Sequence, residues 1–572
     1  MRRSISFWLV AILLSETGIC RGQTVPSAYT DLYTQLSGDL TDFGAGINAV
    51  WSGSTYPVIY AGQLTDANSN NGPNLLVPAS MTPIQTELLM MKAVGLKAVS
   101  VEVSFPMLYS PFLSNVNTGL CVPSTCQANF QTFYANVAAA IRAQGMKVIV
   151  ESQSMMPSGL QSSAWGNYLL ATFYPSLTWE QYKAARAATV AVVAATMQPD
   201  YFVLQEEPDT EASQSGQSSA GQVAGSTSML NGSIAAARGA GVPGMKIGAG
   251  FGSWMPVYQT FANSFTQTGC SVPQPGTQPC IGAPLDFLDM HLFPIIENAI
   301  DCYPGAACST FGSDFTNFWQ NAMAIVNTAN AAGIHMTMSQ SWLRKVRDSE
   351  WFILPDGGDI EEAREAYSFW APLDQSFLQI VYDLANYQGM YWVAPFNTQN
   401  LSAYLTWSSA NAIQNDCGSG TPPCGTLPPS TVFSDVQAAA AAEIAQALYT
   451  STALAWHNLI APGDVTAPSQ PGALRATAFA SSISLNWNPS TDNVGVAGYQ
   501  VWRGGVQVAS VFAPSFQDSG LAVNSSFTYQ VKAFDLASNV SPPATVSVTL
   551  PRPASLSVSG RVGVSGRGGT IQ

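Results

Sequence analysis

Apolar and polar positions follow two alternating periods as far as about residue 460. Short apolar runs of strand length alternate with longer segments of helical spacing, and several of these segments end in glycine. The strand-like runs are 46–50, 97–105, 147–152, 201–205, 246–251, 285–293, 335–340 and 390–396. The helical segments are 82–94, 125–144, 178–198, 227–240, 254–266, 314–332, 360–387 and 434–456. This order predicts an α/β fold, a (β/α)8 TIM barrel over residues 23–460. A doubly wound open sheet is the alternative, but no glycine-rich phosphate loop follows the first strand.

The pattern changes after a linker rich in Pro, Gly and Ser at 461–472. Over residues 467–550, short segments alternate apolar and polar positions and are separated by turn residues. This pattern is typical of a small, all-β antiparallel sandwich. Residues 551–572 are rich in Ser and Gly and predict a flexible tail.

The first 22 residues have the features of a secretory signal peptide. Arg2 and Arg3 precede a short apolar run, and Gly22 is a small residue at the expected cleavage position. A transmembrane anchor would need about 20 apolar residues, whereas Glu16 interrupts this run. We therefore expect a secreted, soluble, extracellular protein without a membrane span, and a monomer.

Amino-acid composition limits the classes of molecule that the protein is expected to bind. Charged residues make up 10% of the chain and the formal net charge is −14, which argues against nucleic acid and anionic membranes. The three histidines, His291, His335 and His457, are widely separated in the sequence. A histidine-rich metal site is therefore not expected, and no cofactor is expected either.

Eight cysteines would remain after signal cleavage, arranged as four close couples in turn-rich stretches. They are Cys121/Cys126, Cys270/Cys280, Cys302/Cys308 and Cys417/Cys424. In an exported protein this arrangement predicts four local disulfides, with free thiols as the alternative.

In a (β/α)8 barrel the active site forms at the C-terminal ends of the strands. The polar and aromatic residues at the predicted strand ends are Asn48, Glu102, Glu151, Glu206, Glu207, Asp289, His291, Gln340 and Trp342, with Trp392 on the last strand. Carboxyl groups beside indoles indicate acid–base chemistry on a neutral, hydroxyl-rich substrate such as a sugar. Glu102 and Glu151 also fit a purely structural role.

Three short motifs in strand order resemble those of clan A glycoside hydrolases, which are retaining (β/α)8 enzymes. They are VLQEEPD (203–209), DMHLFP (289–294) and MTMSQSW (336–342). The resemblance implies that Glu207 is the acid/base and His291 the active-site histidine. The residues expected to contact substrate are His291, Asn48, Trp342, Trp392 and Phe293.

The motifs depart from the family pattern at two positions. Glu206 stands where the family has Asn, and beside Glu207 it is expected to raise the pKa of that carboxyl by charge repulsion. Gln340 stands where the nucleophilic Glu belongs, and an amide cannot form the glycosyl ester. Three alternatives follow: the register of the seventh motif is shifted, or Glu206, Asp289, Asp348 or Glu350 acts as the second carboxyl, or hydrolysis has been lost.

The segment 490–505, STDNVGVAGYQVWRGG, resembles fibronectin type III modules appended to secreted bacterial polysaccharidases. Such a module implies a spacer or a surface-attachment role. The favoured function is hydrolysis of O-glycosidic bonds in a polysaccharide or oligosaccharide. The alternatives are a non-catalytic carbohydrate-binding protein on the same scaffold and a structural or adhesive surface protein.

Overall fold

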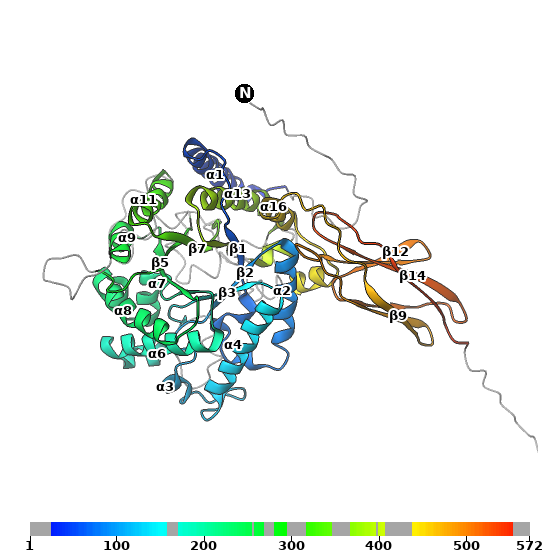
Figure 1. The fold of residues 1–572 in the computed structure, drawn as a ribbon, viewed down its shortest axis with the longest axis horizontal. Helices are drawn as coiled ribbons and strands as arrows, with labels where there is room; N and C mark the ends of the chain where they lie inside the picture. The colour runs from blue at the N-terminus through cyan, green and yellow to red at the C-terminus, as the bar shows by residue number, and fades with distance from the viewer. Residues whose placement is uncertain are drawn as a thin grey trace, which may run out of the picture.

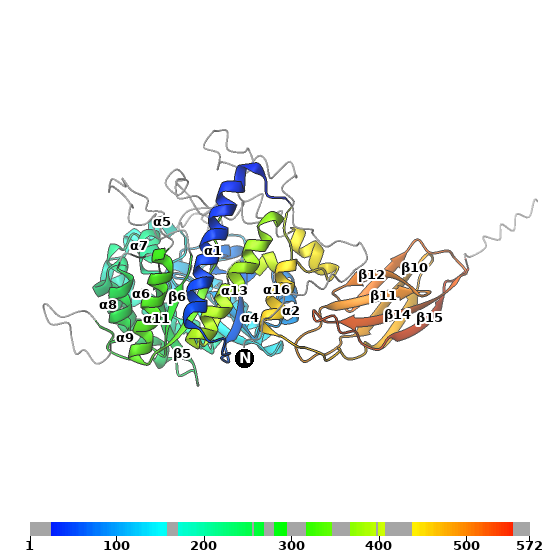
Figure 2. The ribbon, with the colours of Figure 1, turned by 90° about the horizontal axis from the view of Figure 1, so that it is seen from above.

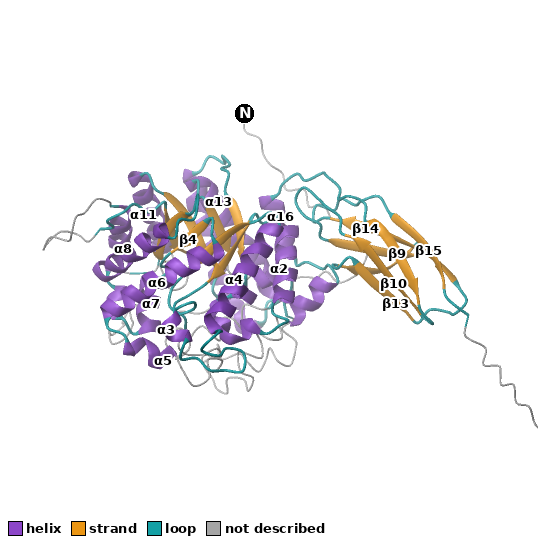
Figure 3. Ribbon diagram, turned by 60° about the horizontal axis from the view of Figure 1, so that its bottom comes forward, coloured by secondary structure: helices purple, strands orange, loops and turns teal. Residues whose placement is uncertain are grey.

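The computed structural model describes residues 24–156, 170–253, 255, 257–267, 280–293, 316–345, 367–395, 398–405 and 438–552. The chain forms a barrel surrounded by helices and, beside it along the long axis, an all-β sandwich (Figure 1). Figure 3, coloured by secondary structure, shows the barrel strands surrounded by helices and a second group of strands in the sandwich. The predicted fold class is confirmed.

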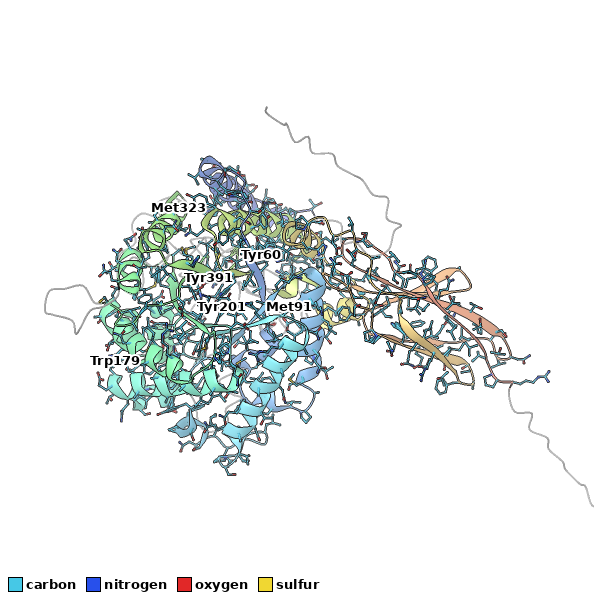
Figure 4. All side chains as sticks on the ribbon, in the orientation of Figure 1. Tyr60, Met91, Trp179, Tyr201, Met323 and Tyr391 are labelled. Atoms are coloured by element: carbon cyan, nitrogen blue, oxygen red, sulfur yellow. A yellow bond between two sulfur atoms is a disulfide. The ribbon has the colours of Figure 1, made fainter. Side chains whose placement is uncertain are left out.

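Eight parallel strands close the barrel in chain order, and β8 pairs with β1. They are β1 (Ile59–Gln63), β2 (Ala98–Glu102), β3 (Lys147–Glu151), β4 (Tyr201–Val203), β5 (Lys246–Gly252), β6 (Phe287–His291), β7 (His335–Ser341) and β8 (Trp392–Pro395). Apolar side chains from six of these strands, including Ile149, Tyr201 and Phe287, fill the interior. Figure 4 labels Tyr201 and Tyr391 there, and their ring centroids are 6.3 Å apart. The barrel interior is therefore a packed core rather than a channel.

The helices lie around the barrel. They are α1 (Thr30–Val50), α2 (Met81–Val94), α3 (Ser110–Leu113), α4 (Cys126–Ala143), α5 (Leu170–Phe173), α6 (Trp179–Met197), α7 (Pro208–Ser215), α8 (Val223–Gly239), α9 (Tyr258–Thr266), α11 (Thr316–Ala332), α13 (Ala371–Gln388) and α16 (Ser451–Ile460). Local sequence sets several of their ends. Thr178 and Gln181 form a reciprocal capping box at the start of α6, and Gly95 ends α2 in the left-handed region.

The prediction of a first strand at 46–50 is wrong. Those residues form the end of α1, and the first strand of the barrel is β1. The buried residues of α1 recur every three or four positions, at Leu32, Leu36, Leu40, Phe43 and Ile47, which is the period of a helix. Figure 2 shows α1 lying alongside α13 on the outside of the barrel.

The sandwich consists of two antiparallel sheets, ordered β13-β10-β9 and β12-β11-β14-β15. The strands are β9 (Gly472–Ala478), β10 (Ser482–Asn488), β11 (Gly498–Arg503), β12 (Val506–Val511), β13 (Ser515–Ser519), β14 (Ser526–Phe534) and β15 (Ala544–Thr549). The alternating residues Ile483, Leu485 and Trp487 of β10 are buried between the sheets, as the sequence predicts.

The sandwich contacts the barrel domain directly. The Tyr449 hydroxyl donates to the backbone oxygen of Ala497 at 2.9 Å, and the Phe512 amide donates to the backbone oxygen of Ala445 at 3.1 Å. A Cβ on Gly495 would lie 2.5 Å from the backbone oxygen of Lys92 in α2, so the close approach there requires glycine.

One predicted disulfide is confirmed in full. Cys121 and Cys126 are bonded, with their Cα atoms 4.8 Å apart. Cys280 is also disulfide-bonded, to a cysteine outside the described residues. Cys270, Cys302, Cys308, Cys417 and Cys424 lie outside the described residues, as do the predicted signal peptide and the tail beyond Arg552. Within the described part of the chain, no helix is long and apolar enough to cross a membrane.

Candidate active site

Side chains at or just beyond the ends of three barrel strands meet through one amide group, and a side chain from a fourth strand joins them through Glu151. The Nε2 atom of Gln340, on β7, donates to Glu151 Oε2 at 3.1 Å and to Glu206 Oε2 at 3.0 Å. Glu151 ends β3, and Glu206 follows β4. Gln63, the last residue of β1, lies with its Nε2 3.5 Å from the same Glu151 oxygen. The predicted residues Glu206 and Gln340 are therefore together, and Glu151 belongs to the same cluster.

His291 and Glu207 form the second part of the site. The Nδ1 atom of His291 lies 2.7 Å from Glu207 Oε1, and Nε2 lies 2.6 Å from the Ser339 hydroxyl. The Ser339 hydroxyl donates onward to Asp289, so its oxygen is left to accept from Nε2. Because both ring nitrogens then donate, this arrangement suits a doubly protonated imidazolium.

Asp289 is the inner end of this chain of hydrogen bonds. Its Oδ1 accepts from the Thr337 hydroxyl at 2.6 Å and from the Ser339 amide at 3.0 Å. On the neighbouring strand β5, a Cβ at Gly250 would lie only 2.9 Å from Asp289 Oδ2. Glycine at this position therefore leaves the space that the carboxylate occupies.

The pKa values of the pair follow from these contacts. Burial alone would lower the pKa of His291, but its hydrogen bonds to Asp289 and Glu207 and their negative charges raise it to about 10. Burial alone would raise the pKa of Glu207. The hydrogen bond and charge of His291, aided by Thr210 and Arg344, outweigh burial and lower it. The expectation that Glu206 raises the pKa of Glu207 is therefore wrong, because His291 dominates.

The two carboxyl groups beside Gln340 are shifted in the opposite direction. Burial, followed by the charges of neighbouring acids, raises the pKa of Glu206 well above its ordinary value. Burial also raises the pKa of Glu151 to about 8, against hydrogen bonds from Ser100 and Gln340 that lower it. At neutral pH we therefore expect both groups to carry protons while Glu207 is ionised.

A third group of polar residues lies at the end of β2. Glu102 Oε2 accepts from Asn68 Nδ2 at 2.6 Å, and Oε1 accepts from the Ser104 hydroxyl at 2.8 Å and from Asn70 Nδ2 at 3.3 Å. Glu102 is partly exposed, unlike Glu151 and Glu206. In the described residues, neither Glu102 nor Glu151 forms an ion pair with Lys or Arg. Both carboxyl groups instead accept hydrogen bonds from neutral side chains.

A buried ion pair anchors the segment that carries Glu206 and Glu207. The Nε atom of Arg186, on α6, lies 2.8 Å from Glu211 Oε1 on α7, and both side chains are fully buried. The guanidinium also donates to the backbone oxygens of Ser152 and Leu204, at 3.1 and 2.9 Å. This arginine thus connects the ends of β3 and β4 to the outer helices.

The predicted aromatic contacts and Asn48 do not form an open sugar-binding surface. Trp392 is fully buried at the start of β8, with its ring 6.2 Å from Tyr201, so the prediction that Trp392 contacts a sugar substrate is wrong. Trp342 is 2% exposed and its ring is 6.2 Å from that of Phe377 on α13. Asn48 is exposed on α1 and is not at a strand end. Phe293 does lie beside His291, with the ring centroids 6.4 Å apart.

Sequence reasoning missed Gln63, Ser339 and the pair Asn68 and Asn70. Gln63 is a strand-end residue, but it was hidden because the first strand was placed at 46–50. Ser339 immediately precedes Gln340 on β7. Only the fold shows that the Ser339 hydroxyl connects His291 to Asp289. Asn70 lies in the 3-10 helix Ser69–Leu76 after β1, Asn68 is the N-cap of that helix, and neither belonged to a recognised motif.

The pKa shifts predict how stability depends on pH. The folded chain keeps the proton of Glu151 up to about pH 8 and that of His291 up to about pH 10, whereas the unfolded chain loses them near 4.5 and 6.5. Because the folded state then binds more protons, the free energy of unfolding should fall as pH rises from about 4.5 to about 10. Thermal unfolding across this range should show a falling Tm. In Glu151→Gln the fall should be shallower below pH 8, and an unchanged slope would contradict the protonation assigned to Glu151.

The chain thus combines a closed (β/α)8 barrel, with acidic residues at its strand ends, and an antiparallel all-β sandwich. No protein-family model matches the chain. The chain is 44% identical over 103 residues to Exoglucanase B of Cellulomonas fimi. The matched segment is 17% of this chain and 9% of that protein. The chain is also 47% identical over 83 residues to Chitinase A1 of Niallia circulans. That matched segment is 14% of this chain and 12% of that protein. The chain thus spans about a tenth of the length of these curated relatives.

Three solved structures to which the chain is similar cover different shares of it, at low sequence identity. A Cellulomonas fimi endo-beta-1,4-mannanase double mutant covers 90% of this chain and 98% of its own, at 12% identity and a TM-score of 0.31. The Ignisphaera aggregans GH53 catalytic domain covers 55% of this chain and 77% of its own, at 13% identity and a TM-score of 0.33. The structure described as FN3tt mut covers 15% of this chain and all of its own, at 19% identity and a TM-score of 0.14.

Proposed function

We propose that the chain is a secreted glycoside hydrolase that cleaves O-glycosidic bonds of a polysaccharide or oligosaccharide by acid–base catalysis. The observation that carries the proposal is the hydrogen-bonded pair of Glu207 and His291 at the strand ends of the barrel. Glu207 is 9% exposed, whereas His291 is fully buried, so Glu207 is the member that a substrate can reach. The names of the similar proteins, an exoglucanase and a chitinase, support a carbohydrate substrate.

The pair supplies the proton that glycoside cleavage requires. In the free protein the proton resides mainly on His291, because the pKa of His291 is raised to about 10 and that of Glu207 is lowered. Transfer from Nδ1 to Oε1 along the 2.7 Å hydrogen bond makes Glu207 a neutral acid, which then protonates the leaving glycosidic oxygen. The hydroxyl of Thr210, 2.5 Å from Oε2, orients the carboxyl group.

Glycoside hydrolysis also needs a second carboxyl group, which activates water or attacks the sugar, and few carboxyl groups of the described site fit this role. Asp289 and Glu206 are fully buried, and Asp289 accepts three hydrogen bonds, so neither presents an oxygen to a sugar. Asp348 and Glu350 lie outside the described residues. Glu102 is the described strand-end carboxyl with the most exposed surface, and we assign it the activation of water. Gln340 at the nucleophile position also favours a second candidate function, carbohydrate binding without hydrolysis.

The proposal is tested by incubating the full chain with glucans, chitin, mannans and galactans and measuring released reducing ends. Hydrolysis of at least one substrate, absent from a Glu207→Gln sample, is the expected result. Binding to a polysaccharide without any release of sugar would instead establish the non-hydrolytic function.

Replacing Gln340 by Glu should raise hydrolysis with retention of anomeric configuration if the site is a degenerate retaining one. It should slow hydrolysis if an acid such as Glu102 activates water, because the added charge repels that acid. Glu151 and Glu206 carry protons at neutral pH, so they can donate hydrogen bonds to a carboxylate placed where the amide now donates to them. That carboxylate would be the nucleophile of a retaining site. Rates and product anomers, the latter by NMR, measure the effect. Gln63→Glu, which places a carboxyl beside the same Glu151 from β1, is the matched control and should not gain activity. If Gln340→Glu changes neither rate nor anomer, Gln340 is not at the reacting centre.

A further inference from the structure

Three aspartates from separate segments meet at the end of the sandwich that adjoins the barrel. Asp464 follows α16, Asp492 lies between β10 and β11, and Asp535 follows β14. One carboxylate oxygen from each lies within 4.8 Å of the other two. Because calcium binds oxygen at about 2.3–2.6 Å, two oxygens on one ion can be up to about 5 Å apart. The spacing therefore fits three ligands of a single calcium ion.

Two of these carboxylates are fixed through one oxygen and leave the other without a partner. Asp464 Oδ1 accepts from the Thr466 amide at 3.0 Å and from Asn493 Nδ2 at 3.1 Å. Asp492 Oδ2 accepts from the amides of Val494 and Gly495, both at 2.9 Å. Asp464 Oδ2 and Asp492 Oδ1 are shielded from solvent and have no hydrogen-bond partner in the described part of the chain. Buried, unpaired carboxylate oxygens are unfavourable unless something neutralises them.

The third carboxylate is the most deeply buried. Asp535 is 2% exposed, and its oxygens accept from the Asn539 amide at 2.8 Å and from Asn539 Nδ2 at 2.9 Å. Asn539 Nδ2 also donates to the backbone oxygen of Asp464 at 3.1 Å, which joins the two segments.

No Lys or Arg of the described residues forms an ion pair with any of the three aspartates. Three acidic groups thus face one another without a compensating cation from the protein, an arrangement that repulsion should open. Hydrogen bonds from Thr466, Asn493, Val494, Gly495 and Asn539 nevertheless hold them in place.

We infer that Asp464, Asp492 and Asp535 bind a calcium ion, with water completing the coordination. The ion would attach the segment after α16 to two loops of the sandwich, next to Gly495, where the sandwich approaches α2. It would therefore fix the orientation of the sandwich against the barrel. The sequence-based expectation that the protein has no metal site rested on its few, widely separated histidines and did not consider carboxylate ligands.

The test uses the full chain, stripped with a chelator and then titrated at constant ionic strength with CaCl2 or, separately, MgCl2. Calorimetry should show one calcium ion bound per chain, and the Tm of the sandwich should rise with calcium concentration. Magnesium should bind at least tenfold more weakly, because it demands a smaller, near-octahedral shell. Equal affinity for the two ions would overturn the choice of calcium, and no binding of either would overturn the site.

Asp492→Asn separates loss of the ion from loss of the fold. Asparagine keeps an oxygen to accept from Val494 and Gly495 but removes the charge. We expect at least tenfold weaker calcium binding and, with chelator present, a Tm at least as high as that of the unaltered chain, because repulsion is relieved. The control Asp42→Asn, on the exposed face of α1, should bind calcium normally. Calcium affinity that is unchanged in Asp492→Asn would show that the ion binds elsewhere.

Discussion

Glu207→Gln should lower the turnover of a cleaved glycoside by at least about 100-fold, because general acid catalysis typically contributes about 10²–10⁴-fold. The amide oxygen can still accept from His291 Nδ1, and the amide nitrogen can donate to the Thr210 hydroxyl oxygen, so the geometry of the site should be retained. It cannot pass a proton to the leaving oxygen. Initial rates on the best substrate of the panel, with circular dichroism to verify folding, measure the effect.

Two further variants make this result specific. Thr210→Val removes only the hydrogen bond that orients Oε2 of Glu207, so it should cost less activity than Glu207→Gln. Glu180→Gln alters an exposed acid on α6, with a side chain 79% exposed, and should leave the rate unchanged. Full activity in Glu207→Gln would remove Glu207 from the mechanism.

Arg186→Met should destabilise the barrel by about 3–5 kcal/mol, the usual cost of removing one partner of a buried ion pair. The change leaves Glu211 fully buried without its cation and leaves the backbone oxygens of Ser152 and Leu204 without their donor. Denaturant unfolding of the barrel measures the loss. Among the described residues, Glu211 would keep the Tyr182 hydroxyl at 2.7 Å and Gln205 Nε2 at 3.0 Å as side-chain donors.

Lys183→Met, on the same helix, is the matched control. Lys183 pairs at 2.9 Å with Glu180, which is largely exposed, and such a pair contributes about 1 kcal/mol or less. A loss in Arg186→Met no larger than in Lys183→Met would mean that the buried pair does not anchor the ends of β3 and β4.

The order of strands and helices could be predicted because seven of the eight barrel strands are apolar runs between helical segments. The first strand was missed because β1 has only five residues, of which Gly62 and Gln63 are not apolar, and because the apolar run at 46–50 was predicted in its place. The helical spacing of Leu32, Leu36 and Leu40 was present in the sequence, and it would have marked α1.

The candidate site could be predicted in part. The strand-end rule found Glu207, His291 and Gln340, and the structure brings them to the same end of the barrel. The rule did not distinguish an indole at the start of a strand from one at its end. Trp392 is the first residue of β8, and its side chain therefore lies in the core and not in the site. Nor could a sequence reveal the direction of the Glu207 pKa shift, since it depends on which neighbour lies 2.7 Å away.

The packing of α1 against α13 has a consequence for the order of folding. Tyr33 and Trp370, whose rings lie 5.9 Å apart, are separated by 370 − 33 = 337 residues in the chain. A chain made from its N-terminus must therefore carry the apolar side of α1 uncovered until α13 has been synthesised. The same delay applies to β1, whose partner β8 comes after α13. Closure of the ring is thus a late, long-range event, which favours slow folding and exposes an aggregation-prone intermediate in the meantime.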